Sequence, residues 1–245
     1  MDYRVISHVP NNAKLQGSIK GDIWPEFMFH DPIAQANWMK FFEFYPEYQL
    51  TLMKGEEVIG IANSLPCVWH GPFDELPEEG WDWAIQQGMA YVGKTAEHNL
   101  LLVLQISLNV RYAGQGISYR MLAELLNLAK AKGLRHVAIP VRPNTKTKYP
   151  LTPIDSFVRW TREDGLPFDP WLRVHVRSGG KIVKTCKRST YIPGTVAEWE
   201  EWTGMKFPET GEYIVEGALV PVKIDREKDL GEYLEPNVWI VYEVN

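Results

Sequence analysis

The sequence predicts an α/β protein in which helices flank a central mixed β-sheet. A hairpin pattern at residues 48–68 has alternating segments on both sides of a short Gly-containing turn. A strand, a glycine turn, a helix and a second strand follow one another over residues 100–141, which is the order of a parallel βαβ unit. Strand patterns dominate both ends of the chain, so we expect the central unit to join them into one sheet.

The composition is that of a globular protein with a substantial core. Of the 245 residues, 45% are hydrophobic, and 10 Trp, 11 Tyr and 9 Phe are too much aromatic surface for a disordered chain. A net charge of −5 without a basic block argues against nucleic-acid binding. The longest apolar run is roughly a quarter of a membrane helix, no secretion signal is visible, and two cysteines suit a reduced compartment. We therefore expect a cytoplasmic protein without a membrane partner, and its oligomeric state is left open.

The N-terminal part predicts a strand, helices and the hairpin. Residues 3–9 have the pattern of a strand. Residues 22–45 carry apolar side chains at helical spacing, but Pro25 and Pro32 interrupt the pattern, so we expect two short helices. A further helix is expected at residues 81–95.

The central part gives the clearest prediction. Residues 100–110 form a run of aliphatic side chains typical of a buried strand, and residues 136–141 form another. The helix between them is expected to end at Gly133, where a left-handed residue is favoured. One face of this helix is apolar, and it consists of Ile117, Met121, Leu122, Leu125, Leu126 and Ala129.

The C-terminal part is less regular. Asp155 is expected to cap a short helix over residues 155–162, and Gly179 to stop a second helix over residues 171–178. The remaining patterns predict strands at residues 181–192 and 238–244, a helix at 196–204 and an extended segment at 213–222.

The glycine turn is a candidate phosphate site. Glycine lets the main chain approach a ligand closely, and the first N–H groups of the following helix have no internal partner, so a phosphate suits Gly114, Gln115 and Gly116. The dinucleotide fingerprint is excluded, because Tyr119 stands where it needs a third glycine. The triphosphate loop G-x-x-x-x-G-K-[ST] is absent as well. A tight turn without a ligand stays open as the alternative.

Residues 106–118 and the helix after them resemble the coenzyme A loop of the GNAT superfamily of acyl-CoA N-acyltransferases, usually written Q/R-x-x-G-x-G/A. Ala113 stands at the usual Gln or Arg, and Ser118 at the usual Gly or Ala. The resemblance implies a GNAT-like fold with acetyl-CoA as cosubstrate. It implies coenzyme binding by Leu108, Val110, Ala113, Gly114, Gln115, Gly116, Ile117, Ser118 and Asn144.

The resemblance covers about residues 100–183 and implies a single domain over residues 1–245. We expect this coenzyme-binding core to contain a long insertion at residues 145–169, and the domain to end in a C-terminal extension at 193–237. His175 stands where many family members have a tyrosine, which implies that it protonates the departing thiolate. A half-buried structural histidine is the alternative.

The resemblance also implies that the two central strands splay apart to hold the thioester, with N–H groups near Leu108 to Val110 meeting its carbonyl. The first strand carries Gln105, Ser107 and Asn109 rather than a carboxylate, so no general base is evident. Candidates for the coenzyme's 3′-phosphate are Arg142, Lys146, Lys148 and Lys181, and a solvated charged face is the alternative for these residues. No metal-ligand spacing occurs among the six His and two Cys, and no metal is expected.

These residues predict an acyltransferase, first of all an N-acetyltransferase that acts on an amine. Acyl transfer to a carrier-protein thiol, with or without malonyl decarboxylation, is a second hypothesis, because a thiol needs less help than an ammonium group. A coenzyme-binding module without catalysis is a third.

Overall fold

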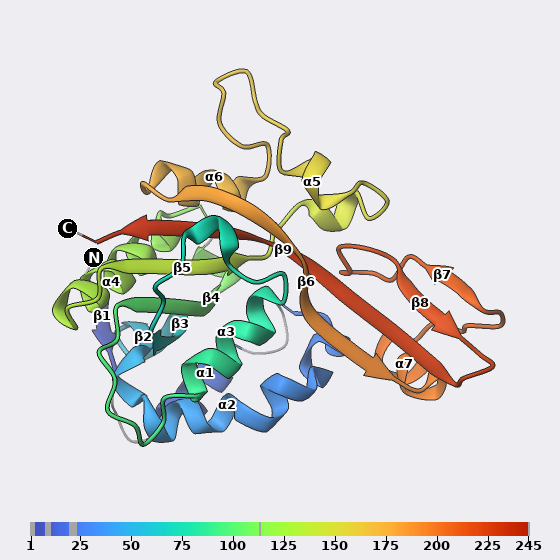
Figure 1. The fold of residues 1–245 in the computed structure, drawn as a ribbon, viewed down its shortest axis with the longest axis horizontal. Coiled ribbons are helices and arrows are strands. Elements are labelled where there is room, and N and C mark those ends of the chain that lie inside the picture. Colours follow the sequence, from blue (N-terminus) through green and yellow to red (C-terminus); the bar gives the residue numbers. More distant parts are fainter. Residues whose placement is uncertain (1–2, 8–10, 20–23, 113, 245) are drawn as a thin grey trace.

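The computed structural model describes residues 3–7, 11–19, 24–112 and 114–244. Among these residues, nine strands form one mixed sheet in the order β1-β2-β3-β4-β5-β9-β8-β7, with β6 paired to β9 (Figure 1). The strands are β1 (Tyr3–Ile6), β2 (Gln49–Lys54), β3 (Glu57–Cys67), β4 (Leu100–Leu108), β5 (His136–Val141), β6 (Lys181–Gly194), β7 (Gly211–Tyr213), β8 (Val222–Asp225) and β9 (Leu230–Glu243). The predicted mixed sheet is confirmed.

Short and long helices connect these strands. The α-helices are α1 (Asn12–Gly17), α2 (Pro32–Phe44), α3 (Gly80–Met89), α4 (Ile117–Ala131), α5 (Ile154–Phe157), α6 (Pro170–Arg177) and α7 (Val196–Thr203). The 3-10 helices are η1 (Glu26–His30), η2 (Pro46–Tyr48), η3 (Phe73–Glu75), η4 (Val110–Tyr112) and η5 (Lys146–Lys148). In the described part of residues 22–45, η1 and α2 are the two predicted short helices.

The central βαβ unit forms as predicted. β4 and β5 are parallel neighbours, α4 connects them, and Gly133 adopts the left-handed conformation after the helix. Strands β2 and β3 form the predicted antiparallel hairpin. The apolar face of α4 is buried against the sheet because its period matches that of the helix.

The helices cover both faces of the sheet. On β3, Asn63 bonds to Gln16 of α1, and Leu65 packs against Gly88 of α3. The side-chain direction of Gly60, by contrast, points towards Met121 of α4. Since successive side chains along a strand point to opposite faces, α1 and α3 lie on one face and α4 on the other.

The same alternation on β9 places α6 with α4. Trp239 contacts Trp83 of α3, while Tyr242 on the other face bonds to His175 of α6. Helix α2 joins α3 through the stacked rings of Trp38 and Trp81. The sheet thus lies between α1, α2 and α3 on one face and α4 and α6 on the other.

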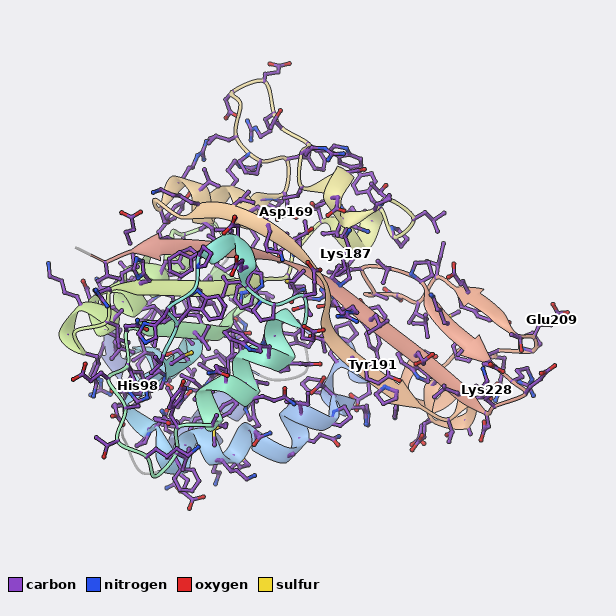
Figure 2. The ribbon with its side chains drawn as sticks, in the orientation of Figure 1. His98, Asp169, Lys187, Tyr191, Glu209 and Lys228 are labelled. Carbon is purple, nitrogen blue, oxygen red and sulfur yellow. The ribbon has the colours of Figure 1, made fainter. Side chains whose placement is uncertain are left out.

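Strands β6 and β9 continue beyond the main sheet into a smaller lobe with β7, β8 and α7 (Figure 1). A second hydrophobic cluster fills this lobe and includes Phe27, Trp199 and Tyr233. Glu209 and Lys228 lie at its far end (Figure 2). The lobe is joined to the rest of the protein by two long strands and by η1, which supplies Phe27.

Two local predictions were wrong. Asp155 does not cap α5, which begins after Pro153, because the Asp155 carboxylate instead pairs with Thr185 and Lys187 of β6. The segment 213–222 is not extended throughout: β7 ends at Tyr213, and a turn with a left-handed Gly217 precedes β8. In both places a contact far away in the sequence or a glycine turn overrides the local pattern.

Candidate active site

The parallel ladder between β4 and β5 is short. Its paired residues run only from Leu100 opposite His136 to Leu102 opposite Ala138. Beyond that point β4 continues along β3 to Leu108, and β5 continues along β9 to Val141. The two strands therefore separate towards their carboxyl ends, as the resemblance implied, and their facing backbone groups have no strand partner there.

A β-bulge explains the separation. Asn63 of β3 pairs with Gln105, but its neighbour Ser64 pairs with Val103, so Leu104 is an extra residue in β4. A bulge bends its strand and increases the local twist. The indole Nε1 of Trp81 donates to the Leu104 carbonyl at 2.7 Å and so provides this oxygen with a partner.

The strand across the gap also favours separation. Pro140 has no N–H and cannot donate a ladder bond. The two strands are predictable from the sequence, but Trp81 is not, because nothing local in α3 indicates a bond to a residue 23 positions away.

A cavity of about 400 Å³ occupies this gap. Leu104, Gln105 and Ile106 line it from β4, and Ile139, Pro140 and Val141 line it from β5. Helices from both faces of the sheet contribute as well, namely α2 and α3 on one face and α6, through Trp171, on the other. The cavity therefore extends between the strands and is accessible to groups from both faces.

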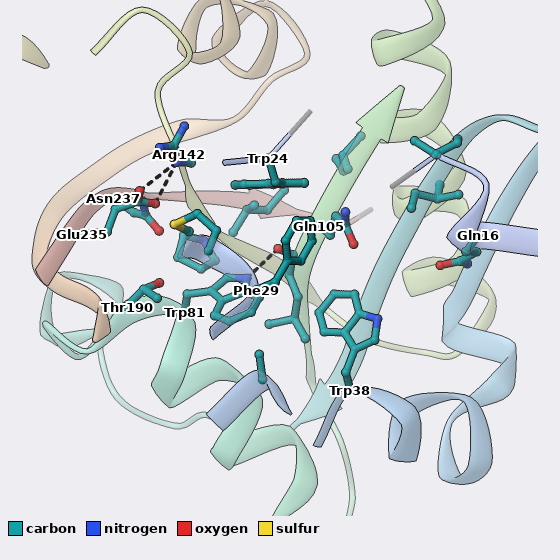
Figure 3. Close-up of a pocket in the computed structure, with 18 of the residues that line it drawn as sticks. Gln16, Trp24, Phe29, Trp38, Trp81, Gln105, Arg142, Thr190, Glu235 and Asn237 are labelled. Atoms are coloured by element: carbon teal, nitrogen blue, oxygen red, sulfur yellow. Dashed lines mark hydrogen bonds and ion pairs between the residues drawn. The ribbon is translucent and has the colours of Figure 1, made fainter. Parts of the chain in front are cut away.

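The cavity wall is largely apolar, with several aromatic rings and one polar end (Figure 3). Trp24, Phe29, Trp38 and Trp81 form much of the wall, and Arg142, Glu235, Asn237 and Thr190 lie together at one side. A concave, mostly apolar wall with a few polar groups is typical of a small-molecule site.

A buried ion pair forms the core of the polar end. The Nε of Arg142 donates to both carboxylate oxygens of Glu235 at 3.0 and 2.9 Å, and the Glu235 side chain is only 1% exposed. Tyr233 and Asn237 donate to the same carboxylate. Burial alone would lower the pKa of Arg142, but the neighbouring carboxylate of Glu235 outweighs it and raises that pKa, so the guanidinium stays charged.

Two buried carboxyl groups lie behind the wall. Asp31 caps α2 by accepting the Ala34 N–H at 2.6 Å, and Asp82 of α3 accepts the Tyr191 N–H of β6 at 2.9 Å. Burial raises the pKa of both groups, and the negative charge of Asp31 adds to this effect at Asp82. Their hydrogen bonds fix the ends of α2 and α3 beside the cavity.

The glycine loop lies where β4 leads into α4. Gly114 and Gly116 have φ values of +75° and +77°, conformations that glycine adopts without strain. No side chain caps α4, and the backbone bond at this end joins the Arg120 N–H to the Gly116 carbonyl. The amides of the first turn, Ile117 and Ser118 among them, thus point out of the helix without an intrahelical partner.

The other predicted coenzyme contacts are spread along the same edge. Gly114, Gln115 and Gly116 are exposed, Ile117 is buried and Ser118 is half-buried, while Ala113 lies outside the described residues. Val110 is 63% exposed in η4 and Leu108 is half-buried at the end of β4. The Asn109 N–H between them is already bonded to the Ile59 carbonyl, so it does not face a ligand.

The residues after β5 have diverse surroundings. Asn144 is exposed and lines the cavity. Lys146 is buried and donates to the carbonyls of Tyr149 and Leu219, and burial lowers its pKa to about 8. Of the four candidates for the 3′-phosphate, Lys146 and the paired Arg142 do not extend into solvent, whereas Lys148 and Lys181 are exposed.

His175 is fully buried on α6, whose start is capped by Asp169. Its Nδ1 lies 2.7 Å from the Tyr242 hydroxyl, and its Nε2 has no partner. Burial lowers the pKa of His175 to about 3, so the imidazole is neutral at pH 7. It is Trp171, one turn earlier on α6, that lines the cavity. The proton-donor role of His175 stays a prediction, which this environment does not favour.

The described residues provide neither a membrane span nor a cluster of metal ligands. None of the described helices has the length and apolar character to span a bilayer. In the same part of the chain, no three His, Cys, Asp or Glu side chains are grouped so that they would hold a metal ion.

Comparisons with known proteins agree with this architecture. No family model matches the chain. The arginine N-acetyltransferase avaD of Aspergillus versicolor is 29% identical over 91% of this chain and 86% of its own length. The loading GNATL domain of CurA from Lyngbya majuscula superposes with a TM-score of 0.65 at 17% identity, covering 100% of this chain and 98% of that domain.

A second solved structure has the same fold. The GNAT-like decarboxylase GphF in complex with isobutyryl-CoA gives a TM-score of 0.60 at 13% identity over 99% of this chain and all of that one. Together with the separated strands and the uncapped glycine loop, these likenesses lead to one conclusion. The chain has the fold of the GNAT acyl-CoA N-acyltransferases, and its similarity to an arginine N-acetyltransferase over most of its length supports an acyltransferase.

Proposed function

We propose that the protein transfers an acetyl group from acetyl-CoA to a nitrogen atom of a small acceptor. The observation that supports this most is the cavity between β4 and β5, which is lined by helices from both faces of the sheet. It lets the thioester enter on the side of α4 and α6 and the acceptor on the side of α2 and α3. Direct transfer requires such close placement of the two reactants.

The glycine loop is the proposed site of the coenzyme's pyrophosphate. Its exposed glycines permit close approach, and the free amides at the start of α4 carry the positive end of the helix dipole. Three or four charge-assisted bonds of about 1.5–3 kcal/mol each supply much of the roughly 8 kcal/mol that micromolar binding needs. Asn144 is proposed to contact the same cosubstrate from the cavity.

The reaction then proceeds in the gap. The acceptor nitrogen attacks the thioester carbonyl, an N–C bond forms and the C–S bond breaks, coenzyme A leaves as a thiolate that takes up a proton, and the nitrogen releases one. The unpaired N–H groups of residues 103–108 that face β5 are the proposed donors to the developing oxyanion. Because the ladder leaves them unpaired, they need no rearrangement.

The acceptor assay follows from the related arginine N-acetyltransferase. Purified protein with acetyl-CoA should release free thiol in the presence of arginine or a related amine, with the acetylated product seen by mass spectrometry. A carrier-protein acceptor and malonyl-CoA test the second hypothesis, transfer to a thiol. This hypothesis is supported by Gln105 and Ser107, because an amide and a hydroxyl stand on β4 where a carboxylate base would be needed for an amine. Thiol release that depends only on the carrier protein, or loss of CO₂, would contradict N-acetyl transfer.

Gly116→Val tests the glycine loop. A β-branched side chain is strained at a φ of +77° and would obstruct the approach of a phosphate, so we expect the Kd for coenzyme A to rise about tenfold or more, or about 1.4 kcal/mol. Calorimetric titration measures this change. Gly165→Val is the matched control, since Gly165 has a φ of +76° and open space around it in the insertion. Equal affinity in the wild type and Gly116→Val would mean that the loop is only a turn.

Trp81→Phe tests the bulge. The variant keeps an aromatic ring on the cavity wall but loses the bond to the Leu104 carbonyl, so the gap is held less firmly. If this bond contributes about 1 kcal/mol to the reactive geometry, kcat/KM for acetyl transfer should fall about fivefold. Trp83→Phe, two residues away on the same helix, is the control and should stay near the wild-type rate. The opposite order of the two variants would refute the role of the bulge.

His175→Gln tests the buried imidazole. The unfolded chain binds a proton at His175 near pH 6.5 and the folded chain only near pH 3, so the free energy of unfolding falls as the pH drops through this window. The expected loss from this group is about 1.4 kcal/mol per pH unit. Urea unfolding between pH 6.5 and 4.5 should depend less on pH in the variant, and equal slopes would disprove the assignment. In the same variant, a lower kcat with unchanged coenzyme affinity would support the proton-donor prediction.

A further inference from the structure

We propose that Arg142 binds a carboxylate group of the acceptor, so that the acceptor is an amino acid or another amine that carries a carboxylic acid. This inference rests on the proposed acetyl transfer to nitrogen and names the acceptor class. It follows from how the hydrogen bonds at the polar end of the cavity are distributed between Arg142 and Glu235.

The guanidinium of Arg142 is fixed in place by hydrogen bonds, but these bonds do not occupy all of its N–H donors. Its Nε is bonded to Glu235, one N–H of Nη2 donates to the Gly217 carbonyl, and the group lies 5.5 Å from the ring centre of Trp24. The Tyr233 hydroxyl also lies beside the guanidinium, and no hydrogen bond of the Nη1 amino group to another described residue is found. Because Arg142 lines the cavity and carries five N–H donors, it offers a ligand donors that are already positioned.

Glu235 is in the opposite situation. Its Oε1 accepts from Arg142 and Asn237, and its Oε2 accepts from Arg142 and Tyr233. A cationic group would have to displace one of these partners, and breaking a buried ion pair is costly. The polar end therefore favours an anion over a cation, and the planar guanidinium suits a carboxylate.

The rest of the cavity suits an aliphatic chain. Trp24, Phe29 and Trp38 present apolar ring surface along the rest of the cavity (Figure 3). Methylene groups of an amino-acid side chain pack well on such surface. Arg142 directly follows β5, so a carboxylate held there leaves the acceptor's nitrogen within the cavity that reaches the gap.

Three matched pairs of acceptors test the carboxylate in the wild-type protein. Arginine, ornithine and lysine are compared with agmatine, putrescine and cadaverine, which lack only the carboxylate. In the pair that is turned over best, we expect kcat/KM to be at least about tenfold higher for the acid, which corresponds to about 1.4 kcal/mol. Equal or faster acetylation of the decarboxylated partner would overturn the proposal.

Variants of the Arg142–Glu235 ion pair test whether Arg142 causes the preference for acceptors that carry a carboxylate. Arg142→Lys keeps the charge beside Glu235 but loses the planar guanidinium with its paired N–H donors. The double variant Arg142→Gln with Glu235→Gln removes both charges, so that neither is left buried without its partner. Both should lose most of the preference for the acid while keeping coenzyme affinity and circular dichroism. Arg162→Gln, on an exposed arginine of the insertion, is the control and should keep the preference. An unchanged preference in the double variant would contradict the role of Arg142.

Measurements of acceptor binding distinguish a failure of the carboxylate proposal from a failure of the proposed acetyl transfer. Calorimetry with coenzyme A present should show heat with an acid of the set and none, or about tenfold weaker binding, with its decarboxylated partner. If this pattern appears but no amine is acetylated, the acceptor class holds and the acetyl transfer fails. If acids and decarboxylated amines are acetylated equally, the transfer holds and the carboxylate proposal fails. If no acid of the set binds, the proposal is likewise refuted.

Discussion

The end of the β4–β5 ladder at Leu102 and Ala138 is the constraint on which the rest of the site depends. Two parallel strands normally pair along their shared length, and here the bulge at Leu104 and the missing N–H of Pro140 prevent this. The protein therefore gives up several backbone hydrogen bonds in the middle of its sheet. Unpaired buried backbone groups are costly, so such a gap is stable only where a side chain, solvent or a ligand meets them.

Different parts of the chain provide the two sides of the gap. The βαβ unit supplies the glycine loop and the start of α4, which face the proposed pyrophosphate, and these residues are continuous in sequence. The polar end of the cavity depends on the C-terminal strands, since Glu235 and the Gly217 carbonyl hold Arg142 from 93 and 75 residues away. The extension thus contributes to the site and is more than an addition to a complete core.

This division explains which features the sequence could predict. The strand, glycine turn and helix of the central unit are local patterns, so the parallel pair, the turn and the apolar face of α4 were predicted correctly. Trp81, by contrast, bonds to a carbonyl, which any residue type provides, and Asp155 contacts β6 instead of capping its own helix. Such contacts depend on how the elements pack, and no local pattern records them.

Two of the buried titratable side chains near the sheet, His175 and Arg142, differ in their surroundings. His175 is isolated from the cavity, has one neutral partner and is kept neutral by burial, which suits a residue that fixes α6 to β9. Arg142 is also largely buried, yet the carboxylate of Glu235 keeps it charged, and its Nη1 group at the cavity wall makes no hydrogen bond to the residues that the structure describes. A protein that only needed stability would gain more from apolar residues of similar size at these positions. A charge kept buried, paired and still able to donate at a cavity is therefore better explained by recognition of an anionic ligand than by the fold.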